Sequence, residues 1–183
     1  MTDRELLHRL RQGDRDAFDA IFREHYPTLV GVAERIVGDR AVAEDVGQDV
    51  MLELWRRRDT VAVEDSLRAY LSRAARNRAL NYLRHERMKQ RTAPFAAGEA
   101  STHAAATARV QEEEIDAAVR QAVDALPERC REVFELSRGQ GLRYAEIARV
   151  LGISVKTVEA QMGKALRVLR ERLAPWLPGG EPD

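Results

Sequence analysis

A segment with almost no large apolar side chains divides this chain into two unequal parts. Residues 92–108 read TAPFAAGEASTHAAATA, in which Phe95 is the one large apolar residue. Such a segment cannot bury enough apolar surface to offset the entropy that is lost when it is ordered. We therefore expect a flexible linker over residues 92–111, between a domain at 1–91 and a second domain at 112–176, with 177–183 as a frayed tail.

The sequence on both sides of this segment has the spacing of α-helices. Val and Ile recur at helical intervals, and Ala, Leu, Arg and Glu dominate, whereas strand signals are nearly absent. Four residues have the type and position of helix N-caps: Thr2, Asp14, Asp39 and Ser66. Pro27 is expected to kink or restart the helix that follows Asp14. The predicted fold class is all-α, with two small helical domains joined by the flexible linker.

Composition excludes several classes of protein. The 183 residues carry 30 Lys+Arg and 30 Asp+Glu, so the formal net charge is zero, unlike that of a uniformly basic nucleic-acid coat protein or an acidic tail. No apolar run approaches the ~20 residues of a membrane span. The charged start MTDRELLHRLRQGD lacks the apolar core of a signal peptide. We therefore expect a cytoplasmic protein with no direct membrane insertion.

The sequence offers little for catalysis. The histidines stand in separate predicted elements without the spacing of metal ligands: His8, His25, His85 and His103. No glycine-rich loop of the phosphate-binding kind is present. The single cysteine, Cys130, cannot form an internal disulfide and lies on the apolar side of a predicted helix. We expect no metal, no cofactor and no enzymatic activity, and a helical enzyme is the alternative with the least support.

The predicted helix over residues 66–89 has an apolar side and a basic side. Projection at about 100° per residue places on the apolar side Leu67, Tyr70, Leu71, Ala74 and Tyr82. It places on the other side Arg73, Arg76, Arg84 and Arg87, with Asn77 and Asn81 on the border. Residues 68–91 contain eight basic side chains and a single acid. A solvated face would interleave acids with the arginines for i,i+4 pairing, so the pattern favours contact with nucleic-acid phosphates. Each Asn could read an unpaired base edge or satisfy a nearby backbone group.

The preceding predicted helix contains AEDVGQDVMLELWRR (residues 43–57) and has two faces with apolar side chains. The face expected in the core carries Val42, Val46, Val50 and Leu54. The second face carries Asp45, Gln48, Asp49, Leu52 and Arg56. A second face of this kind indicates a partner surface. The alternative is that the acids and arginines simply complement the helix dipole.

The segment YAEIARVLGISVKTVEAQMGKALRVLR (residues 144–170) has the pattern of a helix-turn-helix. Ala148 is the small residue where two helices touch, Gly152 allows the turn, and Ser154 caps the second helix. Apolar residues that would fix the crossing are Ile147, Leu151, Ile153 and Val158. Residues expected to meet base edges or phosphates on the second helix are Val155, Lys156, Thr157, Glu159, Ala160, Lys164 and Arg167. This spacing predicts DNA binding.

These segments, in this order, resemble the bacterial RNA polymerase sigma factors of the extracytoplasmic-function (ECF) type, in the sigma-70 family. DAFDAIFREHYPTLVGVAERIVGD is similar to the start of sigma region 2, and AEDVGQDVMLELWRR to the part that docks on polymerase. SLRAYLSRAARNRALNYLRHER is similar to the part that melts and reads the −10 promoter element. The segment from ALPERCREVFEL to KALRVLR is similar to region 4, which reads the −35 element. The family often has Trp where Tyr70 stands, Asp where Asn81 stands, and Ser or Thr where Arg143 stands.

The resemblance implies a dissociable initiation factor without catalysis of its own. The implied polymerase-binding residues are Asp45, Gln48, Asp49, Leu52 and Trp55. The implied −10 residues are Arg73, Arg76, Asn77, Asn81, Arg84 and Arg87. The implied −35 residues are Ser154, Val155, Lys156, Thr157, Glu159, Ala160, Lys164 and Arg167. The implied partners are core RNA polymerase (its β′ clamp helices and β flap), promoter DNA, and an anti-sigma factor for which a membrane anchor is one option.

A helix-turn-helix regulator that binds an operator alone is the main alternative. In that case the first domain would serve as a sensor or dimeriser, and the chain would bind specific duplex DNA without polymerase. This alternative leaves the arginine-rich side of residues 66–89 without a role.

Overall fold

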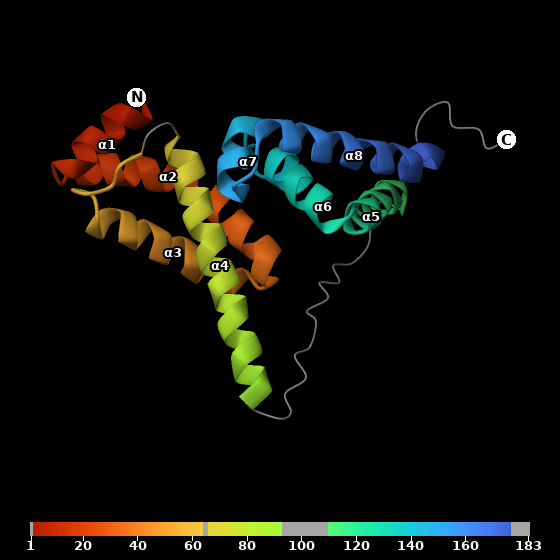
Figure 1. Cartoon of the computed structure of the whole chain (residues 1–183), viewed down its shortest axis with the longest axis horizontal. Helices are drawn as coiled ribbons and strands as arrows, with labels where there is room; N and C mark the ends of the chain where they lie inside the picture. Colours follow the sequence, from red (N-terminus) through yellow and green to blue (C-terminus); the bar gives the residue numbers. More distant parts are fainter. Residues whose placement is uncertain (1, 64–65, 93–109, 177–183) are drawn as a thin grey trace.

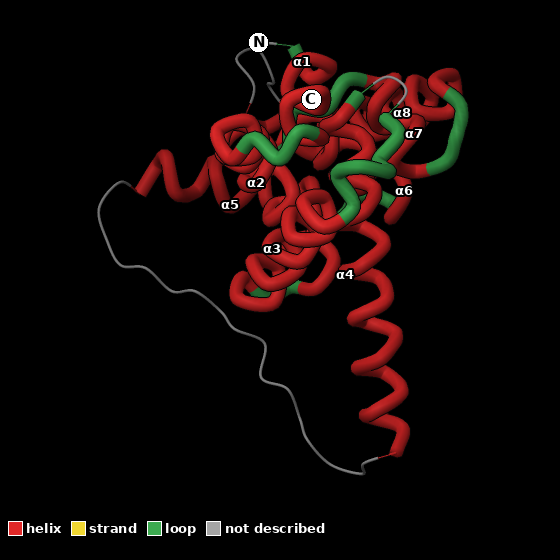
Figure 2. The backbone as a smooth tube through the Cα atoms, turned by 90° about the vertical axis from the view of Figure 1, so that its left-hand side faces the viewer, coloured by secondary structure: helices red, strands yellow, loops and turns green. Residues whose placement is uncertain are grey.

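The computed structural model describes residues 2–63, 66–92 and 110–176, and within these ranges all regular structure is helical (Figures 1 and 2). The all-α prediction is therefore confirmed. The helices are α1 (Asp3–Arg11), α2 (Arg15–Val37), α3 (Arg40–Arg56), α4 (Leu67–Thr92), α5 (Val110–Asp124), α6 (Glu128–Phe134), the π-helical η1 (Glu135–Gly139), α7 (Tyr144–Leu151), α8 (Val155–Leu173) and the short 3₁₀ segment η2 (Ala174–Trp176). We refer to α1–α4 as the N-terminal unit and to α5–α8 as the C-terminal unit.

The helices of the N-terminal unit begin where the sequence places their caps. Thr2 forms a capping box with Glu5, and the Asp14 carboxylate accepts from the N–H groups of Asp16 and Ala17. Asp39 accepts from the N–H of Val42 at 3.1 Å, directly after Gly38 ends α2 with a left-handed φ of 73°. Ser66 accepts from the N–H of Ala69 at 3.2 Å at the start of α4. Satisfied donors at each start explain why the boundaries were predictable.

Pro27 does not restart the helix, so that part of the expectation is wrong. The helix runs without interruption from Arg15 to Val37, with Pro27 inside it. A proline removes one intrahelical donor, which would have bonded to the carbonyl of residue 23. Arg23 and Pro27 are both exposed, so water can satisfy that carbonyl, and packing of the buried face holds the helix together.

The core of the N-terminal unit lies where α1, α2, α3 and α4 meet. Its large, fully buried side chains are Leu10, Ile21, Leu29, Met51, Leu67 and Leu71. The predicted inward face of α3 is confirmed for Val46, Val50 and Leu54, which are buried, whereas Val42 is half-buried. This core fixes the direction of α3 and α4, the two helices whose outer faces were predicted to bind partners.

The apolar side predicted for α4 is only partly correct. Leu67 and Leu71 are buried as expected, but Tyr70 and Tyr82 are 40% and 36% exposed. The helix instead packs through small residues that allow close approach: Ala69, Ser72, Ala75 and Ala79. Both views show the C-terminal half of α4 projecting away from the other helices (Figures 1 and 2), so Tyr82 has no core to enter.

The C-terminal unit has two apolar clusters, and one of them is shared with the N-terminal unit. The first joins α5, α6 and α8 through Ala122, Leu126, Cys130, Ala165 and Leu169, which confirms that Cys130 is a core residue. The second joins α6, α7 and α8 through Val133, Ile147, Val150, Val158 and Met162, and it also contains Val32 of α2 and Ala69 of α4. The two units are therefore packed against each other, not merely tethered.

The expected linker and tail lie outside the described residues, apart from the ends of their ranges. Residues 93–109 and 177–183 are not described, and α5 begins at Val110. Among the described residues, no helix combines the length and apolar character needed to cross a membrane.

Candidate functional site

The helix-turn-helix forms as its sequence predicts. Gly152 ends α7 in the left-handed region, with φ 66°, and Ile153 donates its N–H to the Ala148 carbonyl at 2.9 Å. Ser154 then caps α8 by accepting from the N–H of Thr157 at 3.0 Å. Ile147 and Val158 are fully buried at the crossing of the two helices. The turn therefore holds the start of α8 rigidly at the surface.

The outer face of α8 presents the residues that were predicted to contact DNA. All of them are exposed, namely Ser154, Val155, Lys156, Thr157, Glu159, Ala160, Lys164 and Arg167. Val155, Lys156 and Thr157 stand at the start of the helix, and Lys164 and Arg167 stand further along. A recognition helix that enters a major groove has this arrangement.

The basic side of α4 is exposed except at one residue. Arg73, Asn77, Asn81, Arg84 and Arg87 are exposed, as a phosphate-binding or base-reading surface requires. Arg76, in contrast, is half-buried, and its guanidinium lies 2.9 Å from Oε1 of Glu132 in α6. The predicted side is thus continuous along the helix, but one of its arginines is already paired within the chain.

An open groove separates α4 from α6. Its lining includes Arg76, Arg84 and Arg87 of α4, which face Glu128 and Glu132 of α6. Apolar side chains of α2, α4 and η1 also line it: Val32, Ile36, Leu80, Leu83 and Leu136. A groove with basic side chains and apolar walls can accept an extended or helical acidic ligand.

The outer face of α3 is a separate surface. Asp45, Gln48 and Asp49 are exposed, and Leu52 is 44% exposed. Trp55, which was predicted with them, is half-buried. Its ring packs edge-on against Phe18, with centroids 5.3 Å apart, and Arg58 covers it at 4.7 Å. Trp55 therefore belongs largely to the core and supports this face from behind.

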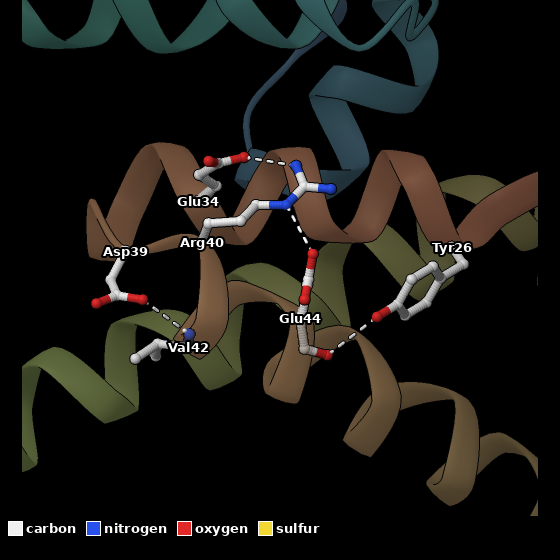
Figure 3. A network of polar contacts seen from close by, with 6 residues as sticks. All are labelled: Tyr26, Glu34, Asp39, Arg40, Val42 and Glu44. Carbon is white, nitrogen blue, oxygen red and sulfur yellow. Dashed lines mark hydrogen bonds and ion pairs between the residues drawn. The ribbon is translucent and has the colours of Figure 1, made fainter. Parts of the chain in front are cut away.

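A polar network fixes the start of α3 against α2 (Figure 3). The guanidinium of Arg40 lies 2.9 Å from Glu34 and 2.9 Å from Glu44, so it bridges the two helices. These bonds, to Glu44 first and then to Glu34, raise the pKa of Arg40. The hydroxyl of Tyr26 also donates to the Glu44 carbonyl at 3.4 Å. The outer face of α3 is thereby held in one orientation.

Several polar contacts join the two units. Besides the Arg76–Glu132 pair, Arg35 is paired with Glu135. Arg68 donates to the Gln140 carbonyl at 2.7 Å, and the Ser66 hydroxyl donates to Glu146 at 2.7 Å. Sequence reasoning missed the partners in α6, η1 and α7. They lie at least 56 residues from the side chains that they contact, so no local period reveals them.

The fold and these surfaces define a helical, helix-turn-helix transcription factor with two further exposed faces. The family model of sigma-70 region 2 matches residues 21–88, and that of sigma-70 region 4 matches residues 116–169. The chain is 32% identical to the ECF RNA polymerase sigma factor SigK of Mycobacterium ulcerans, over 92% of this chain and 91% of that protein. It is 28% identical to the RNA polymerase sigma-H factor of Pseudomonas aeruginosa, over 96% and 95%.

Solved structures agree with these matches. CnrH in complex with the cytosolic domain of CnrY is 26% identical, with a TM-score of 0.66 and coverage of 94% of this chain and 97% of that chain. The sigma factor RpoE of Bartonella quintana, in complex with the anti-sigma factor NepR, shares the fold with a TM-score of 0.63 at 21% identity, over 85% of this chain and 96% of that chain. The chain belongs to the ECF group of the sigma-70 family. It is therefore a factor that directs RNA polymerase to promoters, not an enzyme.

Proposed function

We propose that this sigma factor binds core RNA polymerase through α3. It would read a −10 element with α4 and a −35 element with α8. The observation that carries the proposal is the placement of two basic, exposed helix faces in separate units of one chain. We assign residues 1–91 to region 2, 112–176 to region 4, and 92–111 to the linker between them.

In the −35 element, α8 would lie in the major groove with its start toward the bases. Val155, Lys156, Thr157 and Ala160 stand where base edges pass, and Ser154 holds that end of the helix in place. Glu159 would accept from a cytosine amine or orient Lys156. Lys164 and Arg167 lie further along α8 and would contact phosphates.

In the −10 element, α4 would hold the opened non-template strand. Arg73, Arg84 and Arg87 would contact its phosphates, with Asn77 and Asn81 nearer the bases. Extruding a base costs a few kcal/mol of stacking, which contacts in a pocket and to phosphates offset. Arg76 would join this set after leaving Glu132.

The polymerase contact would use the outer face of α3. Asp45, Gln48, Asp49 and Leu52 would meet the β′ clamp helices, and Trp55 would support them from the core. The C-terminal unit would meet the β flap. Since polymerase is the partner, we place the protein in the cytoplasm.

We further propose that an anti-sigma factor regulates the chain. RpoE of Bartonella quintana was solved in complex with the anti-sigma factor NepR, and CnrH in complex with the cytosolic domain of CnrY. The groove between α4 and α6, with its arginines and apolar walls, is a surface that an acidic helix of that partner would fit. A membrane anchor on the partner is compatible with this assignment.

In vitro transcription on a pool of genomic fragments, with and without the protein, tests the function. We expect new start sites that share two upstream elements. Arg84→Glu should abolish them while the protein still co-elutes with core polymerase, because it repels the strand without touching α3. His85→Glu, an exposed neighbour off the basic side, is the matched control and should retain transcription.

Asp49→Lys should lose both transcription and co-elution, because it alters the polymerase face. If the parent protein gives no new start sites and does not co-elute, yet binds specific duplex DNA alone, the proposal fails and the chain is a stand-alone regulator.

A further inference from the structure

His25 is a buried histidine without a described partner. Its side chain on α2 is 3% exposed, and neither ring nitrogen has a hydrogen-bond partner among the described residues. Buried polar atoms are nearly always satisfied, so an imidazole of this kind points to a ligand that completes it.

Two carboxylates converge on this imidazole. An oxygen of Asp3, an oxygen of Glu24 and a ring nitrogen of His25 all lie within 4.8 Å of one another. Asp3 starts α1, while Glu24 is exposed on α2. A small inward movement of the two carboxylates would bring the three atoms into one coordination sphere, and the exposed Glu24 side gives an entry path.

Asp3, Glu24 and His25 are the metal-ligand candidates, because the other nearby carboxylate is already hydrogen-bonded. Arg68 and Glu146 also act electrostatically on His25. Both carboxylate oxygens of Glu146 are engaged, by the Ser66 hydroxyl at 2.7 Å and by the N–H of Arg143 at 2.9 Å.

We propose that Asp3, Glu24 and His25 bind one divalent transition-metal ion that ties α1 to α2. One imidazole nitrogen and two carboxylate oxygens suit Zn²⁺ or Mn²⁺, with water in the remaining positions. The spacing of the histidines in the sequence predicted no metal site. Spacing detects only ligands that are close together in the chain, whereas Asp3 is brought to His25 from another helix by the fold.

The site also touches the junction between the two units. Oδ2 of Asp3 accepts from the first N–H of α4, that of Leu67, at 3.2 Å. The adjacent Ser66 is bonded to Glu146 of α7. A cation on Asp3 would therefore fasten the start of α1 beside the contact between α4 and α7. The site is separate from the outer faces of α3 and α8.

The test uses the full chain without a polyhistidine tag, stripped with a chelator and titrated with Zn²⁺ or Mn²⁺ alone. Calorimetry for Zn²⁺ and loss of the free-ion EPR signal for Mn²⁺ report the stoichiometry. We expect one equivalent to bind. At a free ion concentration of about 100 times the dissociation constant, the melting temperature should rise by roughly 5 °C or more.

The isosteric variants Asp3→Asn and Glu24→Gln separate binding from folding. Asn still accepts from the N–H of Leu67, and Glu24 is exposed, so both should fold like the parent. Both should lose at least tenfold in affinity and the thermal shift. Asp19→Asn, which removes another exposed acid of α2, and His85→Gln, which removes an exposed histidine, should bind like the parent.

Three results would overturn the proposal. The first is that the parent binds no ion at hundreds of micromolar concentration. The second is that Asp3→Asn and Glu24→Gln bind the ion with the affinity of the parent. The third is that Asp19→Asn loses as much affinity for the ion as these two variants do. The first would leave water as the partner of His25, and the others would identify adventitious surface binding.

Discussion

Asp14 fixes the start of α2 with three hydrogen bonds and one negative charge. Its carboxylate accepts from the N–H groups of Asp16 (2.9 Å) and Ala17 (3.3 Å) and from Nε of Arg9 (2.7 Å). The Arg9 bond, followed by the backbone N–H groups, holds the pKa of Asp14 below its ordinary value of 3.8. A carboxyl with a lowered folded-state pKa stabilises the fold above the ordinary value, and that contribution is lost as the pH falls through the folded pKa.

We expect Asp14→Ala to lower the melting temperature at pH 7, because α2 loses its cap. Asp14→Asn should lower it less, because the amide oxygen still accepts from the two N–H groups. The deficit of Asp14→Asn relative to the parent should shrink as the pH falls below the ordinary value of 3.8, and it should vanish once the carboxyl of the folded parent is protonated. Thermal unfolding followed by circular dichroism from pH 7 into the acid range measures this. Asp19→Asn, without a capping role, should match the parent, and a deficit of Asp14→Asn that persists in acid would contradict the charge argument.

At the scale of the element, α4 combines three functions in one helix. Small side chains on one side, including Ala75 and Ala79, allow the close approach to α2 and α3. The start of the helix contacts the C-terminal unit through Ser66 and Arg68. The projecting half carries Arg84 and Arg87. We therefore expect the free energy of unfolding to be sensitive to substitutions on the inner side of α4 and little affected by those on its outer side.

Ala79→Leu should destabilise the protein by about 1–3 kcal/mol, because three added carbons must enter a fully buried site. Urea unfolding at equilibrium measures the change in free energy. His85→Leu, the same side chain on an exposed turn of α4, should change stability by less than about 0.5 kcal/mol. Equal effects of the two substitutions would mean that Ala79 is not the close contact that its burial indicates.

Elements of this chain were predictable wherever a local signal marks them. Asp14, Asp39 and Ser66 each satisfy donors within three residues, so sequence alone locates the helix starts. The outer faces of α3 and α8 followed from helical periodicity in the same way. Tyr82 was misassigned because periodicity says which side a residue is on, but not whether another element covers that side.

At the scale of the whole molecule, some charged side chains of each unit form ion pairs with the other unit. Arg76 of α4 is paired with Glu132, and Arg35 of α2 with Glu135. The contacts between units could not be predicted, because they join residues far apart across a segment without a pattern. The sequence has 30 basic and 30 acidic residues, and this balance is consistent with ion pairs that neutralise charges within the chain. With the −10 role proposed above, we expect this arrangement to lower the affinity of the isolated chain for DNA.

Glu132→Gln should raise the affinity of the isolated chain for single-stranded DNA by up to about fivefold, because a part-exposed ion pair is worth about 1 kcal/mol or less. Fluorescence anisotropy of a labelled oligonucleotide at low salt measures this. Glu128→Gln removes an exposed acid from the same helix and the same net charge, so it controls for long-range electrostatics. If both variants bind DNA equally well, the pairing of Arg76 has no part in masking α4.

If α4 binds the −10 strand as proposed, the Arg76–Glu132 pair should also change how the affinity for promoter DNA depends on salt concentration. An exposed arginine such as Arg84 displaces a condensed cation from DNA when it meets a phosphate, and each such contact steepens the dependence of affinity on salt. Arg76 exchanges one anion for another, a carboxylate of its own chain for a phosphate. Salt screens the Arg76–Glu132 pair as well, so breaking it costs less at high salt, which offsets part of the cation release from the DNA; Glu132 still keeps its contact with Arg129 at 3.3 Å. The salt slope should therefore be shallower than one full contact for each arginine on the strand, because this chain carries its own counterion for Arg76.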